Sequence, residues 1–183
     1  LNIKGKLNDH MQYLDGKFVG DDRFATRHFI TTNGLPIKKG EHYAMLNIYG
    51  PEAHFAVSDN VSAGIMTSWV AMPIIGSLKY SKQLGEKVHL GVGVLAGSVG
   101  WIKPEAVGAL GYGSLTLGTR SANVTISGGY AGINDGEGGG GAAPLMSLAG
   151  MVKLSKDFTL VGDSFIFMGT AKGGGDDKFA LII

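Results

Sequence analysis

The chain has 183 residues, of which 31 are glycine, 44% are hydrophobic and 17% are charged, and its formal net charge is +1. This length fits one domain, and a charge near zero gives no indication of a nucleic-acid partner. The lack of cysteine excludes disulfides, thiolate metal ligands and thiol nucleophiles. No apolar run approaches the roughly 18 to 20 residues of a membrane-spanning helix. An apolar, glycine-rich chain of this kind is either a soluble β-protein or a membrane β-barrel.

The N-terminal part of the chain differs from the rest. Residues 1–22 are polar and show no sustained hydrophobic period, which is typical of a linker. From Arg23 onward, apolar and polar residues alternate in successive runs. We therefore expect a polar lead-in over 1–22 and an antiparallel, up-and-down transmembrane β-barrel over 23–183.

The alternating runs predict about ten β-strands, or twelve if the chain continues beyond Ile183. In chain order the strands are expected over 24–31, 43–57 with a break at 50–51, 61–70, 73–81, 87–98, 105–117, 122–133, 144–154, 158–168 and 179–183. Several runs reach about 10 residues, which suffices to cross a bilayer at a tilt and exceeds the mean globular strand of about 5 to 6.

Short and long connections alternate between these strands. The short ones read "SDN", "KQLGE", "GTRS" and "SKD", whereas the intervening ones include "TTNGLPIKKGEH", "GWIKP", "NDGEGGGGAA" and "GTAKGGGDD". The connection "AMP" is an exception, since it is short where a long one is expected. Tight turns at one rim and longer loops at the other are typical of outer-membrane barrels.

The two faces of the predicted strands differ in size and polarity. One face carries large aliphatic residues, and the other carries glycine, serine, threonine, asparagine and occasional charges. The large residues suit a lipid-facing surface, and the small polar ones suit a narrow lumen. The residues expected to face lipid are Val88, Leu90, Val92, Val94, Val124 and Ile126. Since period-two alternation does not say which face is inside, a soluble barrel with the faces reversed stays open.

One run breaks the pattern. In 105–117, Leu110 and Tyr112 share one face, while Val107, Leu115 and other apolar residues occupy the opposite one. A glycine-associated β-bulge that switches the register would explain this change.

The lumen is predicted to hold a polar cluster near the short-turn rim. Its members are His54, Lys79, Lys87, His89, Lys153 and Asp163. Two interpretations stay open. The cluster is an ion-pair plug or polar binding site in which Asp163 pairs with Lys79 or Lys153, or it is the hydrogen-bonded polar interior that any small barrel needs. Trp69 and Trp101 lie at strand ends near the long-loop rim, where an interfacial aromatic belt is expected.

The sequence carries no pattern that predicts catalysis. Its five histidines accompany no nucleophile elbow, metal-ligand spacing or paired catalytic carboxylates. "GDD" occurs twice without the ligand ladder of a calcium loop, and "GEGGGG" lacks the lysine and helix of a phosphate cradle. We therefore expect no enzymatic activity, no metal and no cofactor.

Four segments, "ATRHF", "LPIKKGEHY", "VSDNVSAG" and "LVGDSF", resemble a largely uncharacterised family of β-barrel-like proteins from Bacteroidota. Members commonly carry a "LKKGE" segment followed by tyrosines, then a "TDNFSIG"-like hairpin, then a lysine in the next hairpin. The matching residues here are Lys38, Lys39, Gly40, Glu41, Tyr43, Asp59, Asn60, Ser62, Gly64 and Lys79, whereas Ala44 stands where a second aromatic is usual. The likeness runs from Ala25 to Phe167 and implies an outer-membrane-type barrel without a known reaction.

These observations favour a non-enzymatic barrel in the outer membrane of a Gram-negative bacterium. It would be a structural protein or an accessory subunit of an envelope complex, or else a narrow or plugged pore. Its partners would be the lipid bilayer and other envelope proteins that meet the long loops. The alternative is a soluble, lipocalin-like barrel that binds an apolar small molecule.

Overall fold

The computed structural model describes residues 11–14, 17–20, 23–28, 30–155, 158–168 and 178–182. Strands dominate this part of the chain, with one short 3-10 helix, η1 (Arg23–Thr26). The strands are β1 (Met11–Leu14), β2 (Lys17–Gly20), β3 (Tyr43–Leu46), β4 (Pro51–Ala56), β5 (Val61–Thr67), β6 (Ile74–Gly85), β7 (Val88–Ser98), β8 (Val107–Gly118), β9 (Ala122–Asn134), β10 (Gly140–Lys153), β11 (Thr159–Met168) and β12 (Lys178–Ile182). Across these described ranges, no helix has the length and apolarity needed to cross a membrane.

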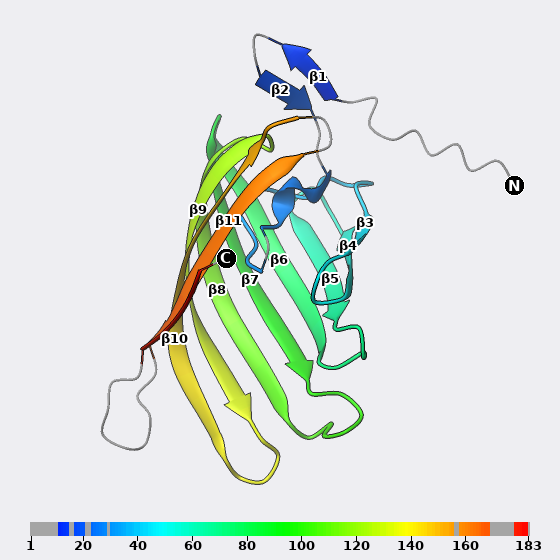
Figure 1. Cartoon of the computed structure of the whole chain (residues 1–183), viewed down its shortest axis with the longest axis vertical. Helices are drawn as coiled ribbons and strands as arrows, with labels where there is room; N and C mark the ends of the chain where they lie inside the picture. The colour runs from blue at the N-terminus through cyan, green and yellow to red at the C-terminus, as the bar shows by residue number, and fades with distance from the viewer. Residues whose placement is uncertain are drawn as a thin grey trace, which may run out of the picture.

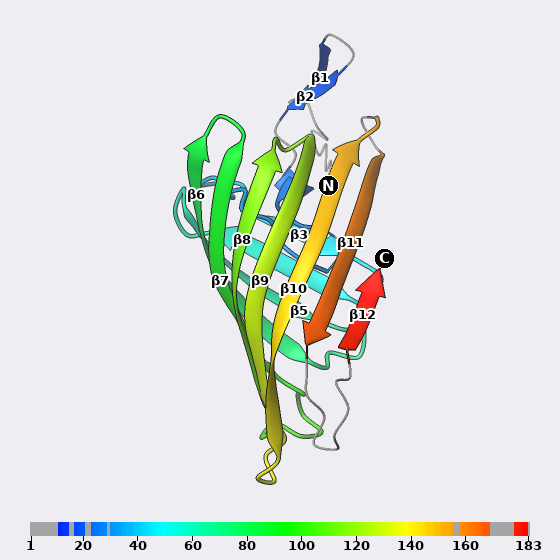
Figure 2. The same ribbon diagram turned by 90° about the vertical axis from the view of Figure 1, so that its left-hand side faces the viewer.

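Strands β3 to β12 form one antiparallel sheet in which each strand pairs with the next one along the chain. The predicted all-β, up-and-down architecture is therefore confirmed. The sheet curls around a hollow, and the long strands share a common tilt (Figures 1 and 2). Among the described residues no ladder joins β3 to β12, so the sheet is open between its two edge strands. In the lead-in, β1 and β2 pair with each other as a separate two-stranded sheet.

The sequence predicts ten strands and the sheet has ten, but the two sets differ between residues 24 and 57. The expected strand over 24–31 does not form; η1 and a bend occupy this region, with a single bridge between Arg27 and Thr32. The expected strand over 43–57 is interrupted near the predicted break at 50–51, where Gly50 adopts a φ of 146° and Pro51 follows it, so the two halves form separate paired strands, β3 and β4. One strand is lost and one is gained.

The loop after β9, which contains the glycine run, is shorter than the sequence predicts. Gly140 and Gly141 belong to β10 and pair with Asn134 and Ile133 of β9, so the loop spans only 135–139. The ladder imposed by β9 overrides the weak strand preference of glycine. The rims still differ. Connections of two, three and five residues join β6 to β7, β8 to β9 and β10 to β11 at one rim, while the six-residue β5–β6 and eight-residue β7–β8 connections lie at the other (Figure 2).

The β-bulge expected in 105–117 does not form. β8 pairs without a register shift with β7 and β9, and the register shift of the β6–β7 ladder lies at Gln83 and Gly85 instead. Leu110 and Tyr112 keep the inward phase of the strand because a cavity, described below, accommodates their side chains.

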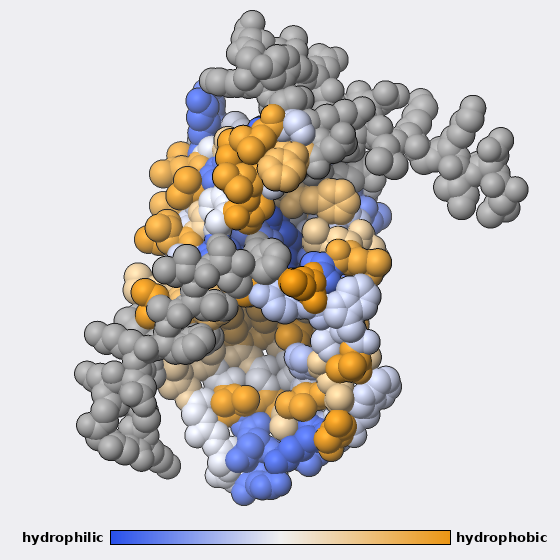
Figure 3. Space-filling model, viewed as in Figure 1, coloured by the Kyte–Doolittle hydropathy of each residue, from blue (hydrophilic) through white to orange (hydrophobic). Residues whose placement is uncertain are grey.

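The two faces of the sheet have opposite chemistry. Large apolar side chains are exposed on the outer face of every long strand from β6 to β11, and Figure 3 shows part of this apolar surface at the upper left of the molecule. The inner face instead buries polar residues. These are His54, Ser62, Lys79, Ser81, His89, Ser114, Thr116, Asn123, Thr125, Ser147 and Asp163.

Candidate functional site

The candidate site lies inside the curved sheet, where residues 24–28 and 30–37, which include most of η1, run along the concave side of the strands (Figure 1). We call these residues the inner segment. It contains some of the most deeply buried residues that the structure describes: Ala25 and Asn33 are 0% exposed, and Leu35 is 2% exposed. Because the inner segment forms almost no ladder of its own, its backbone groups need partners from the sheet, and polar side chains of the inner face supply many of them.

Lys79 of β6 binds the inner segment through its ammonium group. Its Nζ donates to the backbone oxygens of Asn33 (3.1 Å) and Leu35 (3.0 Å), and contacts Thr32 Oγ1 at 3.4 Å. The side chain is buried, and all three acceptors are neutral oxygens. Charge-assisted hydrogen bonds of this kind compensate part of the loss of hydration, and they fix the position of the bend.

Asp163 of β11 binds the inner segment from the opposite wall. Its Oδ2 accepts from the backbone N–H of Ile30 (2.7 Å) and Thr31 (2.8 Å), and its Oδ1 accepts from Thr31 Oγ1 (2.9 Å). The predicted pairing of Asp163 with Lys79 does not form, because each of these two charges is directed at the backbone of the inner segment. The two walls are therefore coupled through that segment.

Neutral polar groups complete the attachment. His28 Nε2 lies 3.1 Å from Asn123 Oδ1 of β9, and Gly34 N donates to Thr116 Oγ1 of β8 at 2.8 Å. Burial of His28 lowers the pKa of its imidazole, although Asn123 and the charge of Asp163 act in the opposite direction. Burial in the inner segment thus favours the neutral form of His28.

The backbone of Gly34 touches the wall directly. A Cβ built on Gly34 would lie 2.7 Å from the backbone oxygen of His89, and one built on Gly91 would lie 3.0 Å from Gly34 Cα. Only glycine at both positions permits this approach without displacing backbone. The inner segment is therefore packed against β7 as well as hydrogen-bonded.

Two ion pairs flank these contacts. Arg27 Nη2 lies 2.9 Å from Glu52 Oε2, and Arg120 Nη2 lies 2.7 Å from Glu41 Oε2 while also donating to the Pro36 oxygen. Both pairs are largely shielded from solvent. They join the region of 27–41 to β4 and to the β8–β9 turn, so they limit the movement of the inner segment at both ends.

The structure places the predicted lumen residues in two groups. His54, Lys79, His89 and Asp163 are buried on the inner face around the inner segment, whereas Lys87 is exposed in the β6–β7 turn and Lys153 is half-buried. Lys87 is not buried because it lies in the tight turn between β6 and β7, where the inward and outward alternation of the strands no longer sets the direction of a side chain.

The predicted lipid-facing residues lie on the outer face. Leu90, Val92, Val94, Val124 and Ile126 are between 36% and 55% exposed, and Val88 is half-buried next to the turn. Trp69 and Trp101 are also exposed, at 62% and 71%, and lie in the connections of the long-loop rim. Trp69 Nε1 donates to the Ile48 oxygen at 3.0 Å.

Sequence reasoning missed the inner segment and its ion pairs. Arg27, Glu52, Arg120 and Glu41 are far apart in the sequence, and no spacing rule connects them. One local pattern does predict a bend: "TTNG" at 31–34 combines threonine, asparagine and glycine, which favour turns over strands. The alternation of neighbouring residues obscured it.

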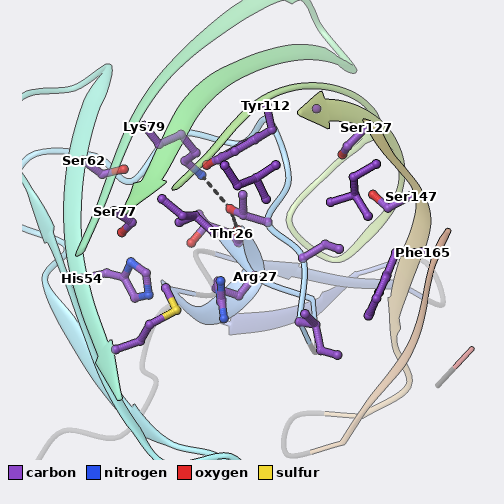
Figure 4. Close-up of a pocket in the computed structure, with 18 of the residues that line it drawn as sticks. Thr26, Arg27, His54, Ser62, Ser77, Lys79, Tyr112, Ser127, Ser147 and Phe165 are labelled. Carbon is purple, nitrogen blue, oxygen red and sulfur yellow. Dashed lines mark hydrogen bonds between the residues drawn. The ribbon is translucent and has the colours of Figure 1, made fainter. Parts of the chain in front are cut away.

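A cavity of about 200 Å³ lies between the inner segment and the sheet (Figure 4). Arg27, Ile30 and Ile37 line it from the inner segment, and the sheet contributes polar and apolar side chains. Those of the sheet include His54, Ser62, Met66, Ser77, Lys79, Leu95, Leu110, Tyr112, Ser127, Leu145, Ser147 and Phe165. Within the described ranges, no group of three or more histidine, aspartate and glutamate side chains is placed to hold a metal ion.

Comparison with family models, with curated proteins and with solved structures gives no match to this chain. The functional argument therefore depends on the geometry alone.

Proposed function

We propose that this protein is a non-enzymatic outer-membrane β-barrel whose lumen is occupied by its own inner segment. The observation that carries the proposal is the division between the two faces of the sheet. Exposed aliphatic and aromatic residues line the outer face, while buried, hydrogen-bonded polar residues line the inner face. This division is the one that a lipid environment requires, since apolar side chains meet the acyl chains and polar side chains meet the lumen.

The size of the apolar surface supports lipid rather than water as its surroundings. Strands β6 to β11 have 10 to 14 residues, and about 9 to 11 suffice to cross a bilayer at a tilt. Soluble monomers rarely expose a contiguous apolar patch of more than a few hundred Å². A surface that is apolar on six consecutive long strands would promote aggregation in water, whereas lipid would cover it.

The inner segment supports a blocked rather than a conducting lumen. It fills the hollow next to the short-turn rim and is held by Lys79, Asp163, His28 and two ion pairs. A polypeptide fixed at so many points leaves little room for solutes to pass. We therefore favour a structural or accessory role in an envelope complex over free diffusion of solutes.

The resemblance to the Bacteroidota barrels favours the outer membrane of a Gram-negative bacterium as the cellular setting. The proposal also includes closure of the sheet into a barrel. The long connections, which include the exposed Trp101, would be the surface that meets partner proteins.

The second candidate is a soluble barrel that carries an apolar ligand. The observation in its favour is the cavity, which includes Leu95, Leu110 and Phe165 on its wall. Against it stands the outer face, because a soluble carrier would expose polar residues there.

Fractionation of the full-length protein decides between the two candidates. We expect recovery only after detergent extraction of membranes, as a β-rich species whose electrophoretic mobility changes on heating. Recovery in buffer without detergent would support the soluble carrier and would contradict the membrane proposal.

A further inference from the structure

Five hydroxyl groups on the wall of the cavity have no hydrogen-bond partner among the described residues. They belong to Ser62 of β5, Ser77 of β6, Tyr112 of β8, Ser127 of β9 and Ser147 of β10. Ser62 and Ser147 are buried, and Ser127 Oγ is shielded from solvent. Buried polar groups are nearly always bonded, so these hydroxyl groups indicate a partner that the chain does not supply.

The charged side chains of the lining already have partners. Arg27 Nη2 pairs with Glu52 Oε2 at 2.9 Å, and His54 Nε2 faces the other oxygen of that carboxylate at 3.6 Å. Lys79 Nζ donates to two backbone oxygens of the inner segment. What remains for a ligand is a set of neutral hydroxyl groups, which both donate and accept hydrogen bonds. An uncharged ligand with hydroxyl groups of its own matches them.

The hydroxyl groups lie on two sides of the cavity, and apolar residues lie between them. Figure 4 shows the serines of β5 and β6 on one side and those of β9 and β10 on the other. Because β7 and β8 lie between these strands in the sheet, Leu95 and Leu110 form the wall between the two sides. Ile30 and Ile37 line the cavity from the inner segment. The space therefore has apolar surfaces on the sheet and on the inner segment, with hydroxyl groups at its edges.

The size of the cavity restricts the ligand further. A volume of about 200 Å³ is below the roughly 300 Å³ at which pockets for drug-sized ligands begin. A single small ring fits, provided that it carries hydroxyl groups around its edge and C–H groups on its two faces. The pyranose ring of a monosaccharide has this distribution of polar and apolar groups.

We propose that this cavity binds an uncharged monosaccharide, with the faces of its ring on the apolar residues and its hydroxyl groups bonded to the four serines and Tyr112. The sugar gives these side chains the hydrogen bonds that they lack in the chain, and its C–H groups displace water from Leu95 and Leu110. This inference goes beyond the membrane proposal and holds whichever medium covers the outer face.

Radiolabelled D-glucose is the probe. Equilibrium dialysis of the full-length protein in lipid nanodiscs, with empty nanodiscs as the blank, is expected to show saturable binding at one site. Tetrahydropyran-2-methanol keeps the ring and the hydroxymethyl group but lacks the hydroxyl groups on the ring, so it should displace labelled glucose about tenfold less well. D-Glucuronate carries a carboxylate in place of the hydroxymethyl group and should also compete about tenfold less well, because burial of an unpaired charge is costly.

Two double variants test the two sides of the cavity. Ser127→Ala with Ser147→Ala removes hydroxyl groups that bond to no described residue, so folding should be unaffected while glucose affinity falls about tenfold. Ser62→Ala with Ser77→Ala makes the same test on the opposite side, and it decides the matter if the first variant does not fold. Ser164→Ala removes a hydroxyl group from the outer face of β11 and is the control that leaves glucose affinity unchanged.

Four results would overturn the proposal. Absence of saturable glucose binding above the blank would mean that water alone fills the cavity. Displacement by tetrahydropyran-2-methanol as strong as that by glucose would exclude recognition of the hydroxyl groups, and equally strong displacement by glucuronate would exclude an uncharged ligand class. Unchanged glucose affinity in the folded double variants would place the binding elsewhere. Fractionation with detergent is scored separately, so failure of the ligand site and failure of the membrane proposal are distinguishable.

Discussion

The outer and inner faces of the long strands show two ways of using the same alternating sequence. On the outer face, residues such as Val92 and Ile126 are about half exposed, and in the proposed bilayer a fluid apolar medium would place no demand on their shape. On the inner face, Lys79 and Asp163 each meet particular atoms of the inner segment. The comparison shows that the outer face depends on composition, whereas the inner face depends on position.

The inner face itself is divided. Near the short-turn rim, Thr116, Thr125 and Asn123 are buried under the inner segment and hydrogen-bonded. Further along the same strands, Leu95 and Leu110 line a cavity. Along β8, Thr116 thus lies where the chain covers its own wall, and Leu110 lies where the chain leaves space.

The largest expected effect comes from removing the buried carboxylate on the inner face. Asp163→Ala leaves the N–H groups of Ile30 and Thr31 without an acceptor, and each buried donor left unsatisfied typically costs about 1 to 3 kcal/mol. The free energy of unfolding, measured by denaturant titration in lipid vesicles, should fall accordingly. Glu86→Ala removes an exposed carboxylate from the β6–β7 turn and is expected to change little. Equal stability of the two variants would mean that the inner face tolerates substitution as the outer face does.

The next effect tests the outer face. Val92→Arg places a charge at the middle of β7, which should cost about 2 to 4 kcal/mol at the centre of a bilayer and block membrane insertion. Val88→Arg adds the same charge to the same face of β7 but next to the turn, where the cost is expected to be about 0 to 1 kcal/mol. The measurement is the fraction folded after mixing with vesicles. Normal folding of Val92→Arg without lipid or detergent would contradict the lipid-facing assignment.

A smaller effect is expected from the close backbone contact. Gly34→Ala introduces a Cβ 2.7 Å from the His89 oxygen, and overpacking of this kind typically costs about 1 to 3 kcal/mol. Gly113→Ala is the control, since a Cβ there meets nothing within 4 Å. Protease cleavage within the inner segment should be faster in Gly34→Ala than in Gly113→Ala. Identical cleavage rates would show that the inner segment is not packed against β7 as tightly as the structure indicates.

The smallest effect concerns pH. Burial lowers the pKa of His28 from its ordinary value of 6.5, so below about pH 6.5 the unfolded state binds more protons than the folded state. The contribution of His28 to stability is therefore complete above that pH and is lost as the pH falls toward the folded pKa. Asn123 and the charges of Asp163, Arg27 and Lys79 all influence this titration. His28→Gln should show a shallower loss of unfolding free energy between pH 7 and pH 5 than the wild type. Identical pH profiles would assign the dependence to other groups.

The sequence by itself determined the all-β architecture, the order of the strands and the two faces of β7 and β9. These features depend on local alternation and on turn residues, and both act over a few positions. It also predicted that His54, Lys79, His89 and Asp163 share one face of the sheet, since phase along a strand sets the face.

Only the tertiary structure decided what those residues do. Residues 24–31 alternate as a strand would, yet the backbone N–H groups of Ile30 and Thr31 donate to Asp163. Lys79 and Thr116 bind the residues that follow, and all three partners lie in strands about 40 to 130 residues further along the chain. No local pattern contains such distances. The cavity likewise lies between the inner segment and the wall that carries Leu95 and Leu110, so it depends on how the chain folds back on its own wall.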